Sequence, residues 1–561
     1  RRCMVRRCRG LLNMDTRSEV PGVNKQRNIE IKDRIRKFAV SSRIFVIILQ
    51  IISNYLVPDH DARVFLLPKH SSQKPADGTV DFLIGGLNRW DSQHFLHIAE
   101  FGYSHENTLA FFPLFPCFIR LLSSAIYSFF ELHFVVTFHS VLLAVSVFVN
   151  VVFFTLAAES LYELSRDVLK EERMAYISAL LFCINPASVF FTAPYSESMF
   201  CYFSFKGLLH WQSESVYFSI LSSCIYFGLA FGSRSNGSVL MFYIVFKFSK
   251  QLLEALKYHN SGLQLRSSLA RKSIFLYFIS IFLVVVVGLI LFVSPFLIFQ
   301  IYSYLHFCLR DKPPKESFFL SSFIEYHNFV LPGSNVTWCS YQFPLSYSYV
   351  QTSYWNLGFL NYYRVEQIPN FLLAFPVIFI VFKQTFHFFM NNVYYACWLG
   401  AHESRLELYY GEVYNNDKFQ KENSSSKLGM YRKSVMPYAI HAFALALVGL
   451  LYFHVQILTR MISSSCPVFY WYASQLSIDQ DLSPVPVKSV FSPMEPESIC
   501  KRQFKSKGCT KSLDDTSVCD LSQGPLYDLE VNCEGNYLLR FYFLTYLIIG
   551  CIMFSNFLPW T

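Results

Sequence analysis

The chain has 561 residues, of which 53% are hydrophobic, 18% aromatic and only 16% charged. The apolar residues come in long runs, which is typical of a polytopic membrane protein and excludes a soluble globular fold. The net charge of +9 lies mainly in connections beside these runs, with no nucleic-acid-binding motif. We therefore expect the basic segments to contact acidic membrane lipid and expect no nucleic-acid partner.

The membrane-spanning helices are predicted from apolar runs, since about 20 apolar residues cross the hydrocarbon layer. Long runs occupy residues 38–57, 134–157, 273–299, 371–390, 439–458 and 538–559. Between residues 175 and 250 the runs are shorter and interrupted, for example at Asn185-Pro186, which indicates three or four short or kinked crossings. The total is about ten transmembrane helices in an all-α protein.

The distribution of lysine and arginine predicts the orientation. Residues 1–43 form a basic segment that should stay in the cytosol, and the connections 166–173 and 247–272 are also basic. The membrane domain is expected to span residues 44–475 and to close with a transmembrane helix at 536–561. Loops 58–133 and 301–368, the turn near Tyr195 and a variable loop at 476–535, within the stretch 461–535, then face the opposite compartment.

Two features agree with a luminal location for these loops. Asn335-Val336-Thr337 is a glycosylation acceptor triplet, although Asn236-Gly237-Ser238 and Asn423-Ser424-Ser425 also match this pattern. Cys500, Cys509, Cys519 and Cys533 fall in the variable loop, where an oxidising lumen would let them form disulfides. Their pairing is left open because four cysteines allow three connectivities.

The first luminal loop carries the richest set of polar residues. Apolar and polar residues alternate at helical spacing from Trp90 to Gly102, which predicts a short amphipathic helix on the bilayer surface that ends at Gly102. Asp91 would lie in its first turn, where the helix dipole favours an ionised carboxylate. His94 shares a face with Asp91, whereas Glu100 lies opposite, so this helix is not expected to supply a pair of carboxylates.

Structural roles are the alternatives for these residues. Asp91 would then be a helix cap, and Trp90 a member of the aromatic belt at the membrane interface. The sequence has no phosphate-cradling glycine loop and no metal-ligand cysteine spacing, and few charged residues lie inside the spans. These observations argue against a nucleotide-driven pump and an ion-coupled carrier, and favour chemistry at a membrane surface.

Several blocks, in order along the chain, resemble the phosphatidylinositol glycan class V family of GPI mannosyltransferase 2 enzymes. They are the Trp90-Asp91 region through Pro116, Phe191 to Ser198, Ser233 to Gly237, Trp355 to Pro376, His454 to Arg460, and the final Asn556-Phe-Leu-Pro-Trp-Thr561. The resemblance implies a GT-C glycosyltransferase in the endoplasmic reticulum membrane. It also implies dolichyl phosphate mannose as donor, a GPI precursor carrying one mannose as acceptor, an α-1,6 product and, as in fungal relatives, a possible small membrane subunit.

The resemblance also suggests roles for individual residues. An inverting displacement needs one base, which we assign to Asp91, with Trp90 as a sugar-stacking or helix-anchoring group. The departing phosphate needs cations or N–H donors, for which Arg460 is preferred over Arg234 and His94. Glu197 is expected to bind acceptor hydroxyls or glucosamine, or else to cap the next helix.

The resemblance has a departure, and two other functions remain open. Many GT-C enzymes carry an acidic pair in this loop, whereas here a lone Asp91 precedes Ser92, so no metal and no cofactor are expected. The alternative functions are a lipid or sugar-lipid transporter or scramblase, and a non-catalytic scaffold of the endoplasmic reticulum.

Overall fold

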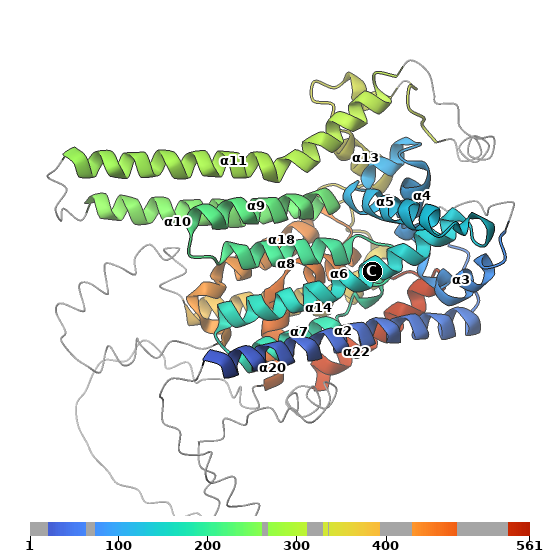
Figure 1. The fold of residues 1–561 in the computed structure, drawn as a ribbon, viewed down its shortest axis with the longest axis horizontal. Coiled ribbons are helices and arrows are strands. Elements are labelled where there is room, and N and C mark those ends of the chain that lie inside the picture. Colours follow the sequence, from blue (N-terminus) through green and yellow to red (C-terminus); the bar gives the residue numbers. More distant parts are fainter. Residues whose placement is uncertain are drawn as a thin grey trace, which may run out of the picture.

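The computed structural model describes residues 21–62, 73–260, 268–310, 329–334, 336–392, 429–478 and 537–560. Every regular element in these ranges is helical (Figure 1). The α-helices are α2 (Pro21–Leu56), α3 (Asp77–Ile84), α4 (Asp91–Phe101), α5 (Leu114–Phe129), α6 (Phe138–Leu169), α7 (Glu172–Cys183), α8 (Glu197–Trp211), α9 (Val216–Ser233), α10 (Met241–Asn260), α11 (Ser268–Phe307), α13 (Ser346–Trp355), α14 (Ile368–Asn391), α18 (Met436–Tyr452), α19 (Leu458–Ser465), α20 (Pro467–Ile478) and α22 (Tyr537–Ser555). Short 3-10 helices are η1 (Gly85–Leu87), η2 (Glu106–Ala110), η3 (Leu132–Phe134), η4 (Ser188–Phe191), η5 (Ser235–Leu240), η6 (Thr337–Ser340), η7 (Val365–Gln367), η8 (Gly429–Tyr431), η9 (Lys433–Val435) and η10 (Val455–Ile457).

Six helical segments are long and apolar enough to cross a membrane. They are Phe138–Leu169, Val216–Ser233, Ile279–Phe307, Val365–Asn391, Lys433–Tyr452 and Leu538–Ser555. Five of the six predicted long runs overlap these segments. The sixth, residues 38–57, forms the second half of α2, which carries buried Arg43 and Gln50. The all-helical membrane architecture is confirmed, and the count of about ten crossings stays a prediction.

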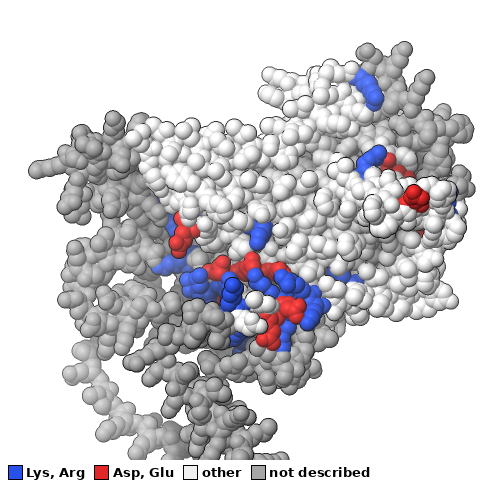
Figure 2. Space-filling view, in the orientation of Figure 1, with Lys and Arg blue, Asp and Glu red and all other residues white. Residues whose placement is uncertain are grey.

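The bundle has two chemically different ends. At one end, α2 forms ion pairs with α6 and α7: Arg27 with Glu172, Lys32 with Glu163, and Arg36 with Glu159. Figure 2 shows the charged side chains of this face gathered mainly there, beside a broad uncharged band over α9 and α11. At the opposite end, α3, α4, α5 and α13 lie close together (Figure 1). We call these the basic end and the α4 end.

The expectation that residues 461–535 lie on the same side as loop 58–133 is wrong for the residues that flank the variable loop. Helices α19 and α20 run from the α4 end back to the basic end, where Trp471 Nε1 donates to Ser165 Oγ at 2.6 Å, near the end of α6. Helix α22 runs parallel to α2, since Cys551 contacts the Val46 carbonyl and Asn556 donates to Ser53. Both boundaries of the stretch 479–536 therefore lie at the basic end.

The crossing by α19 and α20 escaped prediction because it is neither long nor apolar. Pro467, which has no N–H, begins a new helix after Cys466. Three consecutive serines precede the break, and Ser464 donates to the Arg460 carbonyl four residues earlier at 2.8 Å. The Ser464 and Ser465 hydroxyls both donate to carbonyls of their own helix, so they can be buried even though they interrupt the apolar run. Cys500, Cys509, Cys519, Cys533 and Asn335 lie outside the described residues.

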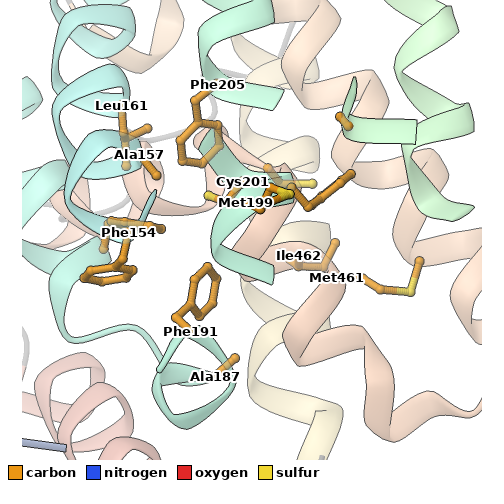
Figure 3. Packing of buried hydrophobic residues seen from close by; sticks show 14 of the residues in the cluster. Phe154, Ala157, Leu161, Ala187, Phe191, Met199, Cys201, Phe205, Met461 and Ile462 are labelled. Carbon is orange, nitrogen blue, oxygen red and sulfur yellow. The ribbon is translucent and has the colours of Figure 1, made fainter. Parts of the chain in front are cut away.

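The break between α7 and α8 positions the residues that follow it. The carbonyls at this break have no partner within a helix, so they need hydrogen-bond donors from elsewhere in the bundle. Arg43, fully buried on α2, donates to the carbonyls of Ser188 at 2.6 Å and Cys183 at 3.0 Å. Asn150 of α6 donates to the carbonyl of Tyr195 at 2.9 Å. Figure 3 shows the apolar packing around this break, where Phe154 and Phe191 face Phe205, Met199 and Ile462. The break thereby delivers Tyr195 and Glu197 to the α4 end.

Candidate active site

Helix α4 begins and ends where the sequence predicts. Asp91 is its first residue, and Gly102, with φ of 78°, follows its last. The backbone N–H of Asp91 belongs to the first turn and therefore has no partner within the helix. It donates instead to the Tyr195 hydroxyl at 3.0 Å. The turn that carries Tyr195 therefore fixes the start of α4.

Arg460 bridges two carboxylates at this point. Its Nη1 lies 3.3 Å from Asp91 Oδ2, while its Nε and Nη2 donate to Glu197 Oε1 at 2.9 and 2.7 Å. The Asp91 side chain is 36% exposed, whereas that of Arg460 is only 9% exposed and that of Glu197 is fully buried. Asp91 is thus the accessible carboxylate, and Glu197 anchors the arginine from inside.

Two aromatic rings complete the surroundings of Arg460. Its guanidinium lies over Phe190 at 4.3 Å and over Tyr195 at 4.9 Å from the ring centroids. Burial opposes the charge on Arg460, and the carboxylates of Glu197 and Asp91, which both pair with it, offset this cost. Arg460 is therefore a cation that two carboxylates and two aromatic rings hold in place.

Glu197 also pairs with Arg234, which stands at the end of α9. Arg234 Nε donates to Asn236 Oδ1 at 3.4 Å. Burial would raise the pKa of Glu197, but the guanidinium groups of Arg234 and Arg460 outweigh it and lower this pKa. Two carboxylates and two guanidinium groups thus form one connected cluster without net charge, so that no charge in it is left uncompensated. Glu197 Oε2 is buried without a hydrogen-bond partner among the described residues.

Trp90 has an unusual backbone for a residue with a side chain. Its φ of 57° lies in the region that favours glycine, and its ring centroid is 6.1 Å from that of Phe557. Its indole Nε1 is buried without a hydrogen-bond partner in the part of the chain that the structure describes. Strained residues of this kind persist only where their surroundings hold them, and they gather at functional sites.

His94 lies one helical turn after Asp91 and is packed among rings. It stacks on Phe111 at 4.7 Å and meets the edge of Trp355 at 6.5 Å. Burial lowers the pKa of His94 to about 3. The imidazole is therefore neutral near pH 7 and can offer an N–H, but it carries no positive charge towards a phosphate.

The structure brings the predicted candidates together and corrects some details. Asp91, Glu197, Arg234 and Arg460 form one cluster, with Trp90, which precedes α4, and His94 of α4 beside it. Arg460 does not end the span that begins near residue 439: α18 ends at Tyr452, and Arg460 lies on α19. Glu197 makes no side-chain cap on α8, because its carboxylate pairs with arginines instead. Glu100 pairs with His139 and not with Asp91, which agrees with its predicted position on the opposite face.

Sequence reasoning missed the contacts that attach the second loop to the first. Glu106, almost fully buried, accepts hydrogen bonds from Trp338 Nε1 at 2.8 Å and from the Tyr354 hydroxyl at 2.6 Å. A disulfide joins Cys308 at the end of α11 to Cys339 beside Trp338. These bonds hold the chain that leads to Trp355 against α4. The missed signal was the occurrence of two cysteines within the same predicted luminal loop, residues 301–368.

Among the described residues no group of three or more His, Cys, Asp or Glu side chains could hold a metal ion. Arginines occupy the space beside Asp91 and Glu197, where a cation would otherwise balance the carboxylates. A metal-independent reaction stays a prediction.

Comparison with known proteins places the chain. The family described as "Mannosyltransferase (PIG-V)" matches residues 31–561. The "GPI alpha-1,6-mannosyltransferase 2" of Homo sapiens is 33% identical over 536 residues, covering 94% of this chain and 99% of the human protein. The "GPI mannosyltransferase 2" of Drosophila melanogaster is 29% identical, covering 94% of this chain and all of the fly protein.

A more distant relative and a solved structure complete the comparison. The Schizosaccharomyces pombe "GPI mannosyltransferase 2" is 26% identical, covering 77% of this chain and 74% of the yeast protein. The Archaeoglobus fulgidus oligosaccharyltransferase has a TM-score of 0.38 and 12% identity, and the match covers 92% of this chain and 55% of the archaeal one. A similarity this weak carries no argument. The family match, which extends over almost the whole length, establishes that the chain belongs to the mannosyltransferase (PIG-V) family.

Proposed function

We propose that this protein adds the second mannose to the GPI anchor precursor. It transfers mannose from dolichyl phosphate mannose to the precursor that already carries one mannose, and it forms an α-1,6 linkage. The similarity to proteins named as GPI mannosyltransferases supports the reaction. The observation that carries the mechanism is the accessible Asp91 carboxylate, held by Arg460 at the end of a buried, charge-balanced cluster.

Asp91 is proposed as the general base. The mannose of the donor is β-linked to phosphate and the product is α-linked, so one inverting displacement is enough. Asp91 Oδ2 pairs with Arg460, while no described residue donates to Oδ1, which leaves Oδ1 for the acceptor hydroxyl. As that hydroxyl oxygen bonds to C1 of mannose, its proton passes to Oδ1, and the bond from C1 to the phosphate oxygen breaks with its electron pair.

Glu197 explains how an arginine can hold the base without disabling it. An arginine paired with Asp91 alone would stabilise the carboxylate and weaken it as a base. Arg460 instead directs two of its three hydrogen bonds to Glu197, at 2.9 and 2.7 Å, and makes the longer one, at 3.3 Å, to Asp91. Glu197 is thus the main counter-charge of the Arg460 guanidinium, and the longer hydrogen bond from Arg460 serves to orient Asp91.

Arg234 is then the better cation for the departing phosphate. Arg460 already donates to carboxylates from all three of its nitrogens. Arg234 pairs with Glu197 through Nη1 and with Asn236 through Nε, and no described residue receives a hydrogen bond from its Nη2. Its side chain is also more exposed, at 15% against 9% for Arg460. We propose that Arg234 Nη2 and a neutral His94 N–H face the phosphate.

The α4 end is proposed to face the lumen of the endoplasmic reticulum. The opposite end carries the lysines and arginines expected in the cytosol, including Lys32 and Arg36. The Cys308–Cys339 disulfide lies at the α4 end, which fits an oxidising compartment. A small membrane subunit, as in fungal relatives, belongs to this proposal without an assigned surface.

Complementation tests the proposed reaction. Cells that lack the second GPI mannosyltransferase would be transfected with this chain, and GPI-anchored proteins at the surface would be counted by flow cytometry. Restored surface staining, with loss of the accumulated mono-mannosylated precursor, is the expected result. Full expression in the endoplasmic reticulum without any change in that precursor would refute the function.

A further inference from the structure

Arg89, the residue before the strained Trp90, joins the start of α4 to the ends of α2 and α22. Its Nε donates to the carbonyl of Ser555, where α22 ends, at 3.1 Å. Its Nη2 donates to Asn54 Oδ1 at 3.0 Å and to Asp59 Oδ2 at 3.0 Å, both near the end of α2. The side chain is only 15% exposed. The first and last helices of the described chain thus meet at the start of α4 through one guanidinium group.

The residues on both sides of this junction have strained backbones. Phe557, like Trp90, has a φ of 57°. The Arg89 guanidinium lies over the Phe557 ring at 4.6 Å, and that ring also packs on Trp90. Two side-chain-bearing residues in a backbone region that favours glycine, packed on each other, show that neighbouring contacts hold this turn in shape.

The backbone of Arg89 is tied directly to Asp91. The Arg89 carbonyl accepts from Ser92 Oγ at 2.6 Å and from the Tyr195 hydroxyl at 3.4 Å. The same hydroxyl receives the backbone N–H of Asp91. A shift of Arg89 would therefore move the first turn of α4, and with it the carboxylate of Asp91.

Residues 555–557 are themselves anchored to the first helix. Asn556 Nδ2 donates to Ser53 Oγ at 2.7 Å, and the Asn556 carbonyl accepts from the His60 N–H at 2.9 Å. Asn556 and Ser53 are almost fully buried. The segment is therefore a fixed platform against which the start of α4 can be set.

We propose that Arg89 is a positioning residue, which transmits the location of residues 555–557 to the Trp90–Asp91 turn and so aims the Asp91 carboxylate. Arg89 itself contacts no substrate in this arrangement. The inference rests on the proposed function, because it assigns Arg89 its role through Asp91. It predicts that residues which follow the last helix control the chemical step without loss of the fold.

The test uses the purified full chain in lipid nanodiscs, with mannosyl transfer measured against both substrates. Arg89→Gln should lower kcat by about tenfold to about 100-fold, because a misplacement of about 1 Å is enough for such a loss. KM for donor and acceptor should change by less than about threefold, since the binding groups remain. Arg89→Lys, which keeps the charge but not the fork of donors, should fall between Arg89→Gln and the parent.

Arg120, which lies on α5 and contacts the other end of α4, offers a matched control. Its Nη1 donates to the carbonyls of Ala99 and Glu100, both at 2.8 Å. Arg120→Gln removes the arginine of α5 that contacts the end of α4 without touching the Trp90–Asp91 turn, so kcat should stay within about twofold of the parent. An equal loss in both glutamine variants would mean that any loosening of α4 impairs transfer, and would overturn the positioning role of Arg89.

A double-mutant cycle separates coupling from general damage. Because Arg89 and Phe557 are proposed to act on one turn, the variant with Arg89→Gln and Phe557→Leu should lose little more kcat than Arg89→Gln alone. Multiplied losses, or a parental kcat in a folded Arg89→Gln protein, would refute the proposal. If Arg89→Gln does not fold, Phe557→Leu alone decides. It keeps the Arg89 hydrogen bonds and should still lower kcat severalfold, and an unchanged kcat would refute the positioning role of Arg89. Parental transfer by Asp91→Asn would refute Asp91 as the base, whereas no mannosyl transfer by the parent protein would instead refute the proposed function.

Discussion

Glu197→Gln is the substitution that most sharply separates the buried cluster from ordinary surface ion pairs. The carboxylate is fully buried, and its Oε1 receives both Arg460 and Arg234. Glutamine has the same shape and keeps an acceptor oxygen, but it removes the negative charge that balances two guanidinium groups. The side chains of these arginines are only 9% and 15% exposed, so water cannot replace the lost charge.

The size of the effect follows from this burial. Removing one partner of a buried ion pair costs about 3–5 kcal/mol, because an uncompensated charge stays behind. The amide oxygen can still accept from Arg460, so we expect the lower end, about 3 kcal/mol of lost stability. Arg460 would then turn towards Asp91 as its one remaining carboxylate, and mannosyl transfer should fall as well.

The assay is the thermal unfolding midpoint of the detergent-purified protein, followed by fluorescence-detected size exclusion. Glu159→Gln is the control, because Glu159 pairs with Arg36, whose side chain is 52% exposed. That pair is worth at most about 1 kcal/mol, so its midpoint should hardly move. Equal midpoints for Glu197→Gln and the parent would show that the Glu197 carboxylate is not needed to balance the two buried guanidinium groups.

Two further substitutions probe the surroundings of the site, and one insertion probes the topology. Tyr195→Phe removes the acceptor of the Asp91 N–H; unfolding measurements should show a loss of about 1 kcal/mol, and kcat should fall while expression stays normal. Trp338→Phe keeps an aromatic ring but loses the hydrogen bond to the buried Glu106 carboxylate, so the unfolding free energy should drop by about 1.5–3 kcal/mol. An unchanged free energy of unfolding would show that this hydrogen bond does not hold the two loops together. A glycosylation acceptor inserted between residues 479 and 536 should stay unmodified in microsomes, since both boundaries lie at the basic end, and a glycan there would contradict the crossing by α19 and α20.

Local signals predicted the start of the site well. The helix from Asp91 to the residue before Gly102 follows from short-range rules: polar residues at its start, helical spacing of apolar residues, and a glycine with positive φ at its end. The exclusion of Glu100 as a partner of Asp91 needed only the angle per residue along one helix. Such inferences succeed because every atom involved lies within three turns of chain.

The partners of Asp91 could not be derived in this way. Arg460 and Glu197 are separated by 263 residues, and Arg460 and Asp91 by 369. No spacing rule connects them, and their meeting depends on how the broken segment after α7 is packed. The resemblance to a family named these residues as candidates, but their arrangement as one charge-balanced cluster came only from the structure.

The predicted orientation failed where composition hides a crossing. The segment from α19 to α20 contains Pro467 and three consecutive serines, so it lacks an uninterrupted apolar run of the required length. Ser464 and Ser465 donate to carbonyls of their own helix, and hydropathy does not register such bonds. One missed crossing reverses the expected side of the chain that follows it, which is why the residues that flank the stretch 479–536 were placed on the wrong side.

The rate of mannosyl transfer by Asp91→Asn tests the central claim most directly. Asparagine keeps the shape of the side chain and an oxygen that can pair with Arg460, but it cannot take a proton from the acceptor. Removal of a general base typically lowers the rate by about 10²–10⁴-fold, so we predict a kcat at least about 100-fold below the parent with little change in donor KM. A folded Asp91→Asn protein that transfers mannose at the parental rate would contradict the assignment of Asp91 as the base.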